Sequence, residues 1–249
     1  MSLGLSIFAI AFGYFIGAIS FARLVVRVVD PDKAKWEKTT IEYPASEHAI
    51  ETDLVSATSV RLRLGARYGC LTAILDIVKG FVPTLLVWMW FPEQPYYLLT
   101  SVATVVGHNW PVYYKFQGGR GLSPILGGFL AVDAIGLVIT HVLGFVLTFL
   151  TASPMWAFLG GIMLTVPWFL IARRDPVLAV YALIINIIFF YATRGEFKQV
   201  KEIQDSGYKP TEEEYLARGE TGSARMTRMM DNYTLPSLIK RLRTRNEQS

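Results

Sequence analysis

Three glycines within four residues form the segment best suited to bind a phosphate group. Gly118, Gly119 and Gly121 stand before an apolar run, and Lys115 and Arg120 lie beside them. Glycine lets the backbone approach a ligand closely, and successive N–H groups at the start of a helix attract anions. The two basic side chains add positive charge. The pattern predicts a phosphate site, and the alternative is a tight turn or close helix packing.

A second group of polar residues lies within apolar sequence. Asp76 and Lys79 are three residues apart, so a helix places both on one face. Because charges inside a membrane are costly, the pair indicates a functional site, or else a structural pair whose members neutralise each other. His108 lies near the end of another apolar run, where it would orient a substrate, relay a proton or form a structural hydrogen bond.

The distribution of charge defines the elements that must position these groups. Only 18% of the residues are charged, and the mean hydropathy is +0.36. Residues 1–22 and 96–114 contain no Asp, Glu, Lys or Arg, and His141 is the only ionisable side chain between Asp133 and Arg173. Such runs are long enough to cross a bilayer, where the backbone must satisfy its own hydrogen bonds. The sequence therefore predicts a helical membrane protein.

The apolar runs and their breaks predict an all-α fold, a polytopic membrane bundle of about seven transmembrane helices. Proline, glycine and aspartate end or kink helices, and the breaks fall at Pro92 with Pro95, 118–121, Asp133, Pro154 and Pro176. The expected helices are 3–26, 68–91, 96–114, 121–132, 135–151, 155–172 and 176–193. The fourth is too short to cross a membrane upright.

Basic residues predict the orientation of the bundle in a cell membrane. They gather in the loops 27–67 and 115–120 and in the tail after Arg194. Cytoplasmic loops carry an excess of Lys and Arg, so these segments are expected in the cytoplasm, with the N-terminus outside and the C-terminus inside. Arg173 and Arg174 would then face outward, against the same rule.

The chain divides into two regions by composition. Residues 1–203 are expected to form the transmembrane domain, with a polar cytoplasmic loop at 28–56, and residues 204–249 a cytoplasmic tail. The end of the tail, 229–245, mixes apolar and basic residues and is interrupted by Pro236. It is either an interfacial helix on an anionic membrane surface or a flexible, solvated terminus.

Several classes of site are disfavoured by residue counts. Cys70 is the only cysteine, so no disulfide forms within one chain. The three histidines have no close spacing, so neither a metal site nor a cofactor is expected. The basic residues are explained by membrane orientation, so no nucleic-acid partner is expected.

Two segments resemble motifs of the acyl-phosphate:glycerol-3-phosphate acyltransferases, the PlsY family. GHNWPVYYKFQGGRGLSP at 107–124 resembles that family's glycine-rich motif, whose usual form is GH, two residues, P and then FKGGKG. SATSVRLRLGARYGCLTAILDIVKGFVP at 56–83 resembles its GATN segment running into a D-x-x-K-G helix. Residues 17–21 are similar to its GSIPF start, and 193–198 lie where the family has HRxNI. The resemblance covers roughly 5–203, apart from the loop 28–51.

The resemblance implies transfer of an acyl chain from acyl phosphate to the primary hydroxyl of glycerol 3-phosphate, giving lysophosphatidate and phosphate. Membrane lipid would hold the acyl tail between helices. An acyl phosphate is already activated, so the enzyme must chiefly hold two anionic groups together and stabilise the oxyanion. No covalent acyl-enzyme is required, and Cys70 need not act as a nucleophile.

Residue by residue, the resemblance assigns two sets of groups. The catalytic set is His108, Lys79 and Arg120. The phosphate-binding set is Thr58, Ser59, Arg61, Arg63, Lys115, Gly118, Gly119, Gly121 and Arg194. Both sets come from segments expected at the cytoplasmic surface.

The chain also departs from the family pattern. The family's GSGN is replaced by Glu51, Thr52, Asp53 and Leu54, and acids beside a phosphate site repel it. Ser59 replaces the Asn of GATN, and Leu62 takes the place of the following Arg. Thr193, Glu196 and Arg120 replace the family's His, Asn and Lys. The chain is therefore either a divergent enzyme or a relative that has lost the chemistry.

Three functions follow from these observations. The first is a membrane glycerol-phosphate acyltransferase. The second is a catalytically silent protein that binds lipid or acts as a scaffold. The third is a transporter whose polar path would run through Asp76, Lys79, Asp133, His141 and Asn186. The clustering of polar residues at one surface and the lack of repeated, interrupted helices favour the first over the third.

Overall fold

The structure is a computed structural model that describes residues 1–33, 36, 39–42, 49–52, 55–153, 156–205, 207–208, 211–217 and 221–239. The α-helices are α1 Leu3–Gly17, α2 Phe21–Val29, α3 Ala57–Leu64, α4 Ala66–Trp90, α5 Tyr96–Asn109, α6 Leu122–Thr151, α7 Gly161–Met163, α8 Thr165–Pro167, α9 Pro176–Asp205, α10 Glu212–Ala217 and α11 Thr221–Tyr233. Short 3-10 turns are η1 Pro31–Lys33 and η2 Val112–Tyr114, and π-helical turns are η3 Trp156–Gly160 and η4 Trp168–Ala172. Strands β1 Thr39–Glu42 and β2 Ala49–Thr52 complete the described elements.

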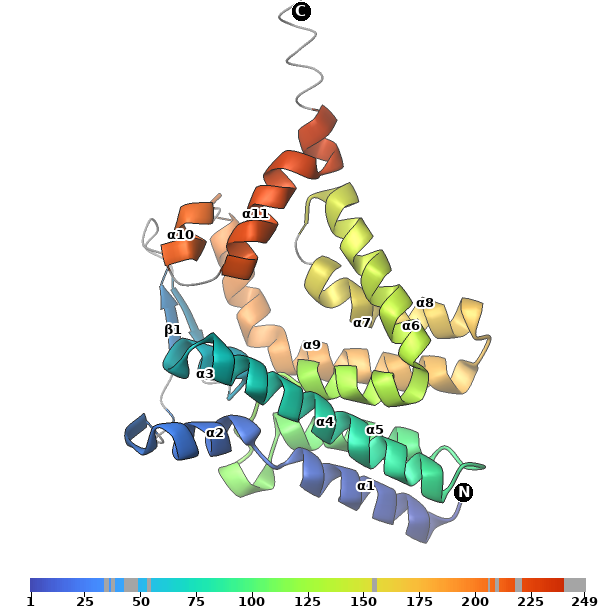
Figure 1. The fold of residues 1–249 in the computed structure, drawn as a ribbon. Helices are drawn as coiled ribbons and strands as arrows, with labels where there is room; N and C mark the ends of the chain where they lie inside the picture. Colours follow the sequence, from blue (N-terminus) through green and yellow to red (C-terminus); the bar gives the residue numbers. More distant parts are fainter. Residues whose placement is uncertain are drawn as a thin grey trace, which may run out of the picture.

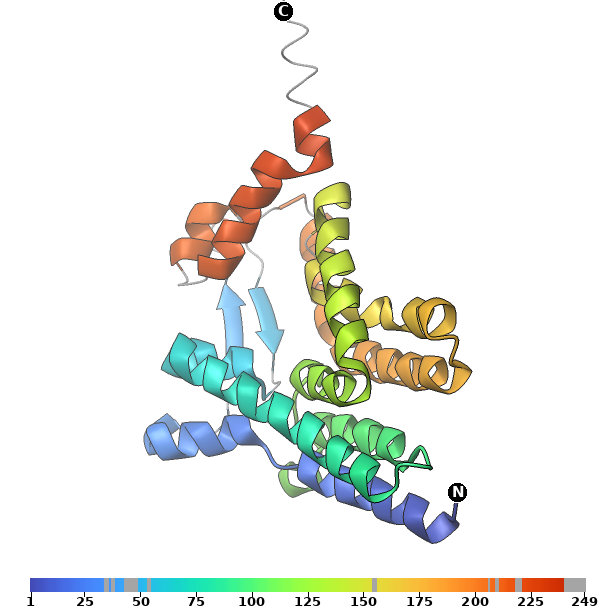
Figure 2. The same ribbon diagram turned by 45° about the vertical axis from the view of Figure 1, so that its right-hand side comes forward.

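The helices α1, α4, α5, the first part of α6 and the first part of α9 lie side by side as a bundle (Figures 1 and 2). Small residues bring them close: a Cβ on Gly13 or Gly17 of α1 would lie 2.3 or 2.1 Å from a backbone oxygen of α5. Such contacts are typical of helix packing in membranes. Four described stretches are long and apolar enough to span a bilayer: Leu3–Val29, Ala66–Trp90, Leu122–Thr151 and Pro176–Gln199. The predicted helical membrane fold is confirmed.

The first span is not the single helix that was expected over 3–26. α1 ends at Gly17 and α2 begins at Phe21, where the Ser20 hydroxyl accepts a hydrogen bond from the Arg23 N–H at 3.4 Å. The break exposes the carbonyl of Ile19, which accepts a hydrogen bond from the Lys79 ammonium at 2.8 Å. A buried donor on another helix therefore satisfies the interrupted backbone.

The expected break at Asp133 is confirmed: α6 consists of two helical segments that meet at a kink at this residue. The backbone of Asp133 is non-helical, at φ −155° and ψ 84°, and its carboxylate accepts hydrogen bonds from Gly136 N at 2.9 Å and Trp168 Nε1 at 2.9 Å. Arg173 Nε donates to the same carboxylate at 2.7 Å. Arg173 is thus paired with a carboxylate 40 residues away, which compensates its positive charge at this end of the bundle.

Two residues of the transporter hypothesis, His141 and Asn186, form hydrogen bonds with backbone carbonyls. His141 Nδ1 lies 2.8 Å from the Leu137 carbonyl, one helical turn away. Asn186 Nδ2 donates to the carbonyls of Ile162 at 3.2 Å and Ala182 at 2.8 Å. Because these side chains bond to backbone carbonyls of their own or a packed helix, their geometry does not favour transport.

Two polar regions lie outside the bundle. In the loop 28–56, β1 and β2 form an antiparallel hairpin that the sequence did not predict, with Thr39 opposite Thr52. In the tail, α10 and α11 pack against each other and stand apart from the bundle (Figure 1). The expected tail helix 229–245 is interrupted: α11 ends at Tyr233, a further helical turn covers 235–239, and the rest lies outside the described residues.

Candidate functional site

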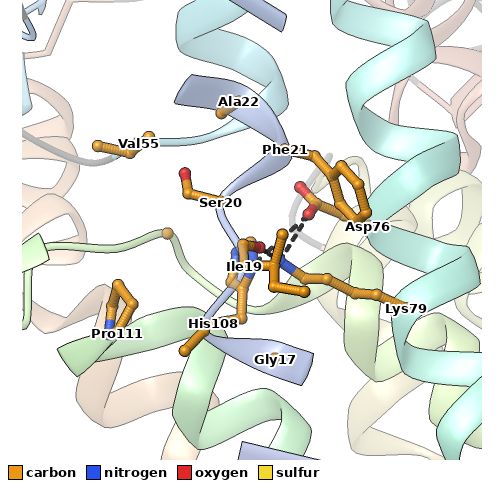
Figure 3. Close-up of a pocket in the computed structure, with 12 residues that line it drawn as sticks. Gly17, Ile19, Ser20, Phe21, Ala22, Val55, Asp76, Lys79, His108 and Pro111 are labelled. Atoms are coloured by element: carbon orange, nitrogen blue, oxygen red, sulfur yellow. Dashed lines mark hydrogen bonds and ion pairs between the residues drawn. The ribbon is translucent and has the colours of Figure 1, made fainter. Parts of the chain in front are cut away.

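A buried ion pair lies beside the break between α1 and α2. Lys79 Nζ is 2.8 Å from Asp76 Oδ1, and the two side chains are each 3% exposed. The same ammonium donates to the Ile19 carbonyl, so it is fixed between α4 and the connection that follows α1 (Figure 3). The expected placement of both residues on one helical face is confirmed.

His108 lies on the other side of Asp76. Its Nδ1 is 3.7 Å from Asp76 Oδ1, and the side chain is buried at the end of α5. A Cβ on Gly119 would lie 2.2 Å from His108 Nε2, so the glycine loop packs directly on the imidazole. His108, Lys79 and Gly119 line one pocket, together with 17–22, Val55, Asp76 and Pro111 (Figure 3).

The loop 118–121 has the shape of an anion cradle. The Gly118 carbonyl accepts a hydrogen bond from Val55 N at 2.9 Å, and Gly119 N donates to the His108 carbonyl at 3.1 Å. Gly121 has φ +82° and directly precedes α6, with no side chain capping the helix. The N–H groups of Leu122 and Ser123, in the first turn of the helical segment that runs to the kink at Asp133, therefore lie next to this loop. The loop needs glycine because a side chain would collide with α5 or strain the turn.

Arg120 does not project into open solvent. Its Nη2 forms an ion pair with Glu196 Oε1 from α9, and the Arg120 and Glu196 side chains are 32% and 14% exposed. The Arg120 Nε atom is buried and has no hydrogen-bond partner among the described residues. Glu196 therefore neutralises one face of the guanidinium and leaves another face available.

Of the four predicted residues of α3, Thr58 and Ser59 lie in the first turn of the helix, at the end that contacts the glycine loop. The residue before the helix cap, Val55, bonds to Gly118, and Ser59 is buried with its hydroxyl 3.3 Å from that of the capping Ser56. Thr58 is half-buried on the same first turn. These contacts place the start of α3 beside the cradle.

Arg61 and Arg63 occupy the last turn of α3, away from its capped end. Arg63 Cζ lies 4.5 Å from the centre of the Trp36 ring. Arg61 packs against α4, because a Cβ on Gly69 would lie 2.6 Å from Arg61 Cβ. Neither arginine lines the pocket beside Lys79.

Lys115 and Arg194 also lie apart from that pocket. Lys115 is exposed, with a left-handed backbone at φ 52°. Arg194 is exposed on α9, with Cζ 3.9 Å from the centre of the Tyr191 ring. The structure thus brings Lys79, His108 and Gly119 together and leaves these two cations at the rim.

Two further residues of the site were not predicted. Arg23 donates from Nη1 to the Gln117 carbonyl at 2.9 Å, and its Cζ lies 4.3 Å from the Tyr114 ring centre, so it braces the glycine loop from α2. Asn109 ends α5 and lines a second pocket with Gly118 and Gly119. The sequence signal for Asn109 was its place between His108 and the glycines.

The arrangement can hold an anion and move a proton. The Lys79 ammonium and the loop N–H groups other than that of Gly119, which is bonded to the His108 carbonyl, supply positive potential. His108 supplies a proton acceptor 3.7 Å from Asp76. The first residues of α3 and α6 and the last residues of α5 converge there, so helix ends position the chemical groups. Such a site suits a reaction between two phosphate-bearing substrates.

Comparisons with known proteins agree with the motifs. Residues 48–202 match the family model described as glycerol-3-phosphate acyltransferase. A protein of that name from Aquifex aeolicus (strain VF5) is 31% identical over 129 residues, which are 51% of this chain and 60% of that relative. Another from Maridesulfovibrio salexigens is 25% identical over 217 residues, 82% of this chain and 97% of that relative. The match thus spans three fifths of the first relative and nearly all of the second.

Two crystal structures have a similar fold. Both are of PlsY (YgiH), an integral membrane glycerol 3-phosphate acyltransferase. The lysophosphatidic acid form gives a TM-score of 0.61 at 24% identity, covering 79% of this chain and 92% of that one. The glycerol 3-phosphate form gives 0.62 at 22% identity, covering 82% and 99%. At this identity the likeness establishes the fold.

Proposed function

The chain belongs to the glycerol-3-phosphate acyltransferase family, and from this membership we propose that it moves an acyl chain from acyl phosphate to the 1-hydroxyl of glycerol 3-phosphate. The products are lysophosphatidate and inorganic phosphate, as in phospholipid biosynthesis. The observation that carries the proposal is the contact of the glycine loop with a buried Lys79–Asp76–His108 cluster, through Gly119. That contact joins an anion cradle to a proton acceptor.

In the proposed reaction the 1-hydroxyl oxygen attacks the acyl carbonyl carbon. The new C–O ester bond forms as the bond between the acyl carbon and the phosphate oxygen breaks, and phosphate leaves with that electron pair. His108 accepts the hydroxyl proton, oriented by Asp76 at 3.7 Å. Lys79 and the N–H groups of Gly118, Arg120 and Gly121 stabilise the charge on the oxyanion and on the departing phosphate.

We place the remaining predicted residues in supporting roles. Arg120, once released from Glu196, would bind a phosphate through its fork of donors. Thr58 and Ser59 would bound the cradle from the start of α3. Arg61, Arg63, Lys115 and Arg194 would raise the local concentration of anionic substrates without touching the reacting atoms.

We further propose a cell-membrane location with the N-terminus outside and the C-terminus in the cytoplasm. The basic segments at 115–120 and after Arg194 support this orientation. Residues 1–203 would act as the transmembrane domain and 204–249 as a cytoplasmic tail. The acyl chain would then lie among lipid-facing side chains while the phosphates stay at the surface.

One observation favours the catalytically silent alternative. Glu196 forms an ion pair with Arg120, and a carboxylate at a phosphate site repels an anionic substrate. The side chains of Glu51 and Asp53, which were expected to oppose phosphate as well, lie outside the described residues. The substitution Glu196→Gln distinguishes the active enzyme from the silent protein. An active enzyme should keep or increase its phosphate release, whereas a silent protein should stay inactive.

The reaction is tested with purified protein, palmitoyl phosphate and glycerol 3-phosphate, by measuring phosphate and lysophosphatidate. Lys79→Ala and Arg120→Ala should reduce product formation, while Lys198→Ala, which alters an exposed lysine on α9, should not. Equal, background-level phosphate release from the wild type and from Lys79→Ala would refute the proposed reaction for this substrate pair.

A further inference from the structure

Asn109 is a buried amide whose hydrogen-bonding capacity is unused. The residue is 3% exposed, and neither Nδ2 nor Oδ1 has a hydrogen-bond partner among the described residues. Leaving a donor and an acceptor unsatisfied inside a protein is costly, so such a group is rare unless something else binds it. Asn186 is the matched contrast, because it is 7% exposed and its Nδ2 donates to two carbonyls.

The Asn109 amide faces the start of α6. A Cβ placed on Gly121 would lie 2.6 Å from Asn109 Oδ1 and 3.2 Å from Nδ2. Asn109 also lines a pocket with Trp110, 116–119 and Ala192. The unused amide therefore lies where the first turn of α6 meets the glycine loop.

The neighbouring side chain repeats the pattern. Arg120 Nε is buried without a hydrogen-bond partner in the described part of the chain. Donors alone would suit a bare phosphate, whose oxygens accept. The Asn109 amide differs because it offers an acceptor, Oδ1, next to a donor, Nδ2. The group that satisfies both atoms is one that donates and accepts, namely a hydroxyl close to the phosphate.

We propose that Asn109 recognises the 2-hydroxyl of glycerol 3-phosphate, with the hydroxyl donating to Oδ1 and accepting from Nδ2. The phosphate of the same molecule would lie on the N–H groups of 118–121. Asn109 then selects hydroxylated phosphate esters over phosphate esters that lack this hydroxyl. The inference rests on the proposed function, since it names the residue that identifies the acceptor substrate.

The test measures binding, so that it does not depend on acyl transfer. Full-length protein in detergent is titrated with radiolabelled glycerol 3-phosphate, in competition with 3-hydroxypropyl phosphate, which lacks the 2-hydroxyl. The wild type should prefer glycerol 3-phosphate by about tenfold, the effect of one or two neutral hydrogen bonds. Asn109→Leu should reduce this preference to about twofold or less while retaining 3-hydroxypropyl phosphate binding. Asn186→Leu should keep the wild-type preference.

Thermal unfolding separates recognition from a structural role. Without ligand, Asn109→Leu should melt at the same temperature as the wild type or higher, because leucine removes an unsatisfied buried amide. Asn186→Leu should melt lower, because it loses two hydrogen bonds. Lower melting of Asn109→Leu and of the smaller Asn109→Ala would assign Asn109 a structural role and overturn the inference.

The remaining outcomes are also decisive. A wild type that binds the two esters equally, or an Asn109→Leu variant that keeps the preference, overturns the recognition by Asn109. Preferential binding that depends on Asn109, in a protein that forms no lysophosphatidate, would sustain this inference and refute the proposed reaction. The two proposals therefore fail separately.

Discussion

Two buried carboxylates in the bundle have different surroundings. Asp133, at the bend of α6, receives hydrogen bonds from Gly136, Trp168 and Arg173, and both of its oxygens are used. Asp76, on α4, is 2% exposed and has the Lys79 ammonium on one side and His108 at 3.7 Å. The Asp133 carboxylate has hydrogen-bond donors at both oxygens, whereas the Asp76 carboxylate has fewer donors and can accept a further hydrogen bond.

The comparison separates a charge that fixes the fold from a charge that we propose acts in the reaction. A fully bonded carboxylate fixes a helix bend, because every donor that it needs is supplied by the fold. An incompletely bonded cluster beside a glycine loop can exchange partners when a substrate arrives. The two asparagines repeat the contrast, since Asn186 serves helix packing and Asn109 has unused atoms.

The largest expected effect is on the functional pair. Lys79→Met should lower kcat/KM for phosphate release by about 10²–10³-fold, because it removes charge stabilisation at the reacting groups. It should also destabilise the fold by leaving Asp76 uncompensated. The double variant Asp76→Asn/Lys79→Met should recover the melting temperature without recovering activity. Activity in the double variant would show that the pair is structural.

Loss of the Asp133–Arg173 pair should lower stability and leave substrate binding unchanged. Asp133→Ala should reduce the free energy of unfolding by about 2–3 kcal/mol, less than for fully buried pairs because of the exposure of Arg173. The KM for glycerol 3-phosphate should change by no more than about twofold, since the two sites share no partner. Denaturant titration and steady-state kinetics measure the two effects. A large change in KM with unchanged stability would reverse the assignment of the two carboxylates.

The glycine loop connects the comparison to substrate binding. Gly119→Ala should lower kcat/KM by about 10- to 100-fold, because its Cβ must displace His108 or the loop. Gly195→Ala is the matched control: apart from its own helix backbone and chain neighbours, no atom of the described residues lies within 4 Å of its Cβ position on α9. That control should gain about 0.5–1 kcal/mol of stability and keep its kinetics. Equal kinetics for the two variants would remove the loop from the site.

The smallest effect concerns an exposed pair in the tail. Arg228 Nε donates to Glu212 at 2.8 Å, and this hydrogen bond holds the pKa of the Glu212 carboxyl below its usual value. A lowered pKa means that the pair stabilises α10 against α11 above the ordinary carboxyl pKa and is lost as pH falls through the folded value. Hydrogen exchange in α10 should rise over that window, and Arg228→Ala should remove the pH dependence. A rise that persists in Arg228→Ala would exclude this pair as its cause.

The sequence predicted those features that depend on spacing along one helix. Asp76 and Lys79 share a face because three residues separate them, and the glycine loop precedes a helix as expected. The break after Gly17 was missed, because Ala18 and Ile19 carry no strong helix-breaking signal. The Ile19 carbonyl at this break accepts a hydrogen bond from Lys79, which is 60 residues away, and spacing along the sequence cannot reveal such a contact.

Contacts between distant segments account for the other differences. The sequence did not predict that Arg173 pairs with Asp133 or that Glu196 pairs with Arg120, because each pair joins residues at least 40 positions apart. The position of Asn109 between His108 and the glycines was its one sequence signal, and it was not sufficient because a polar residue at a helix end has many uses. Burial without a partner is a property of the fold and cannot be deduced from sequence.

The most direct test of the central claim is a structure of the protein with glycerol 3-phosphate bound. The proposal predicts the phosphate within hydrogen-bonding distance of the N–H groups at 118–121, with the 2-hydroxyl at the Asn109 amide. A phosphate bound instead on the outer face, against Lys115 or Arg194, with Arg120 still paired to Glu196, would contradict it.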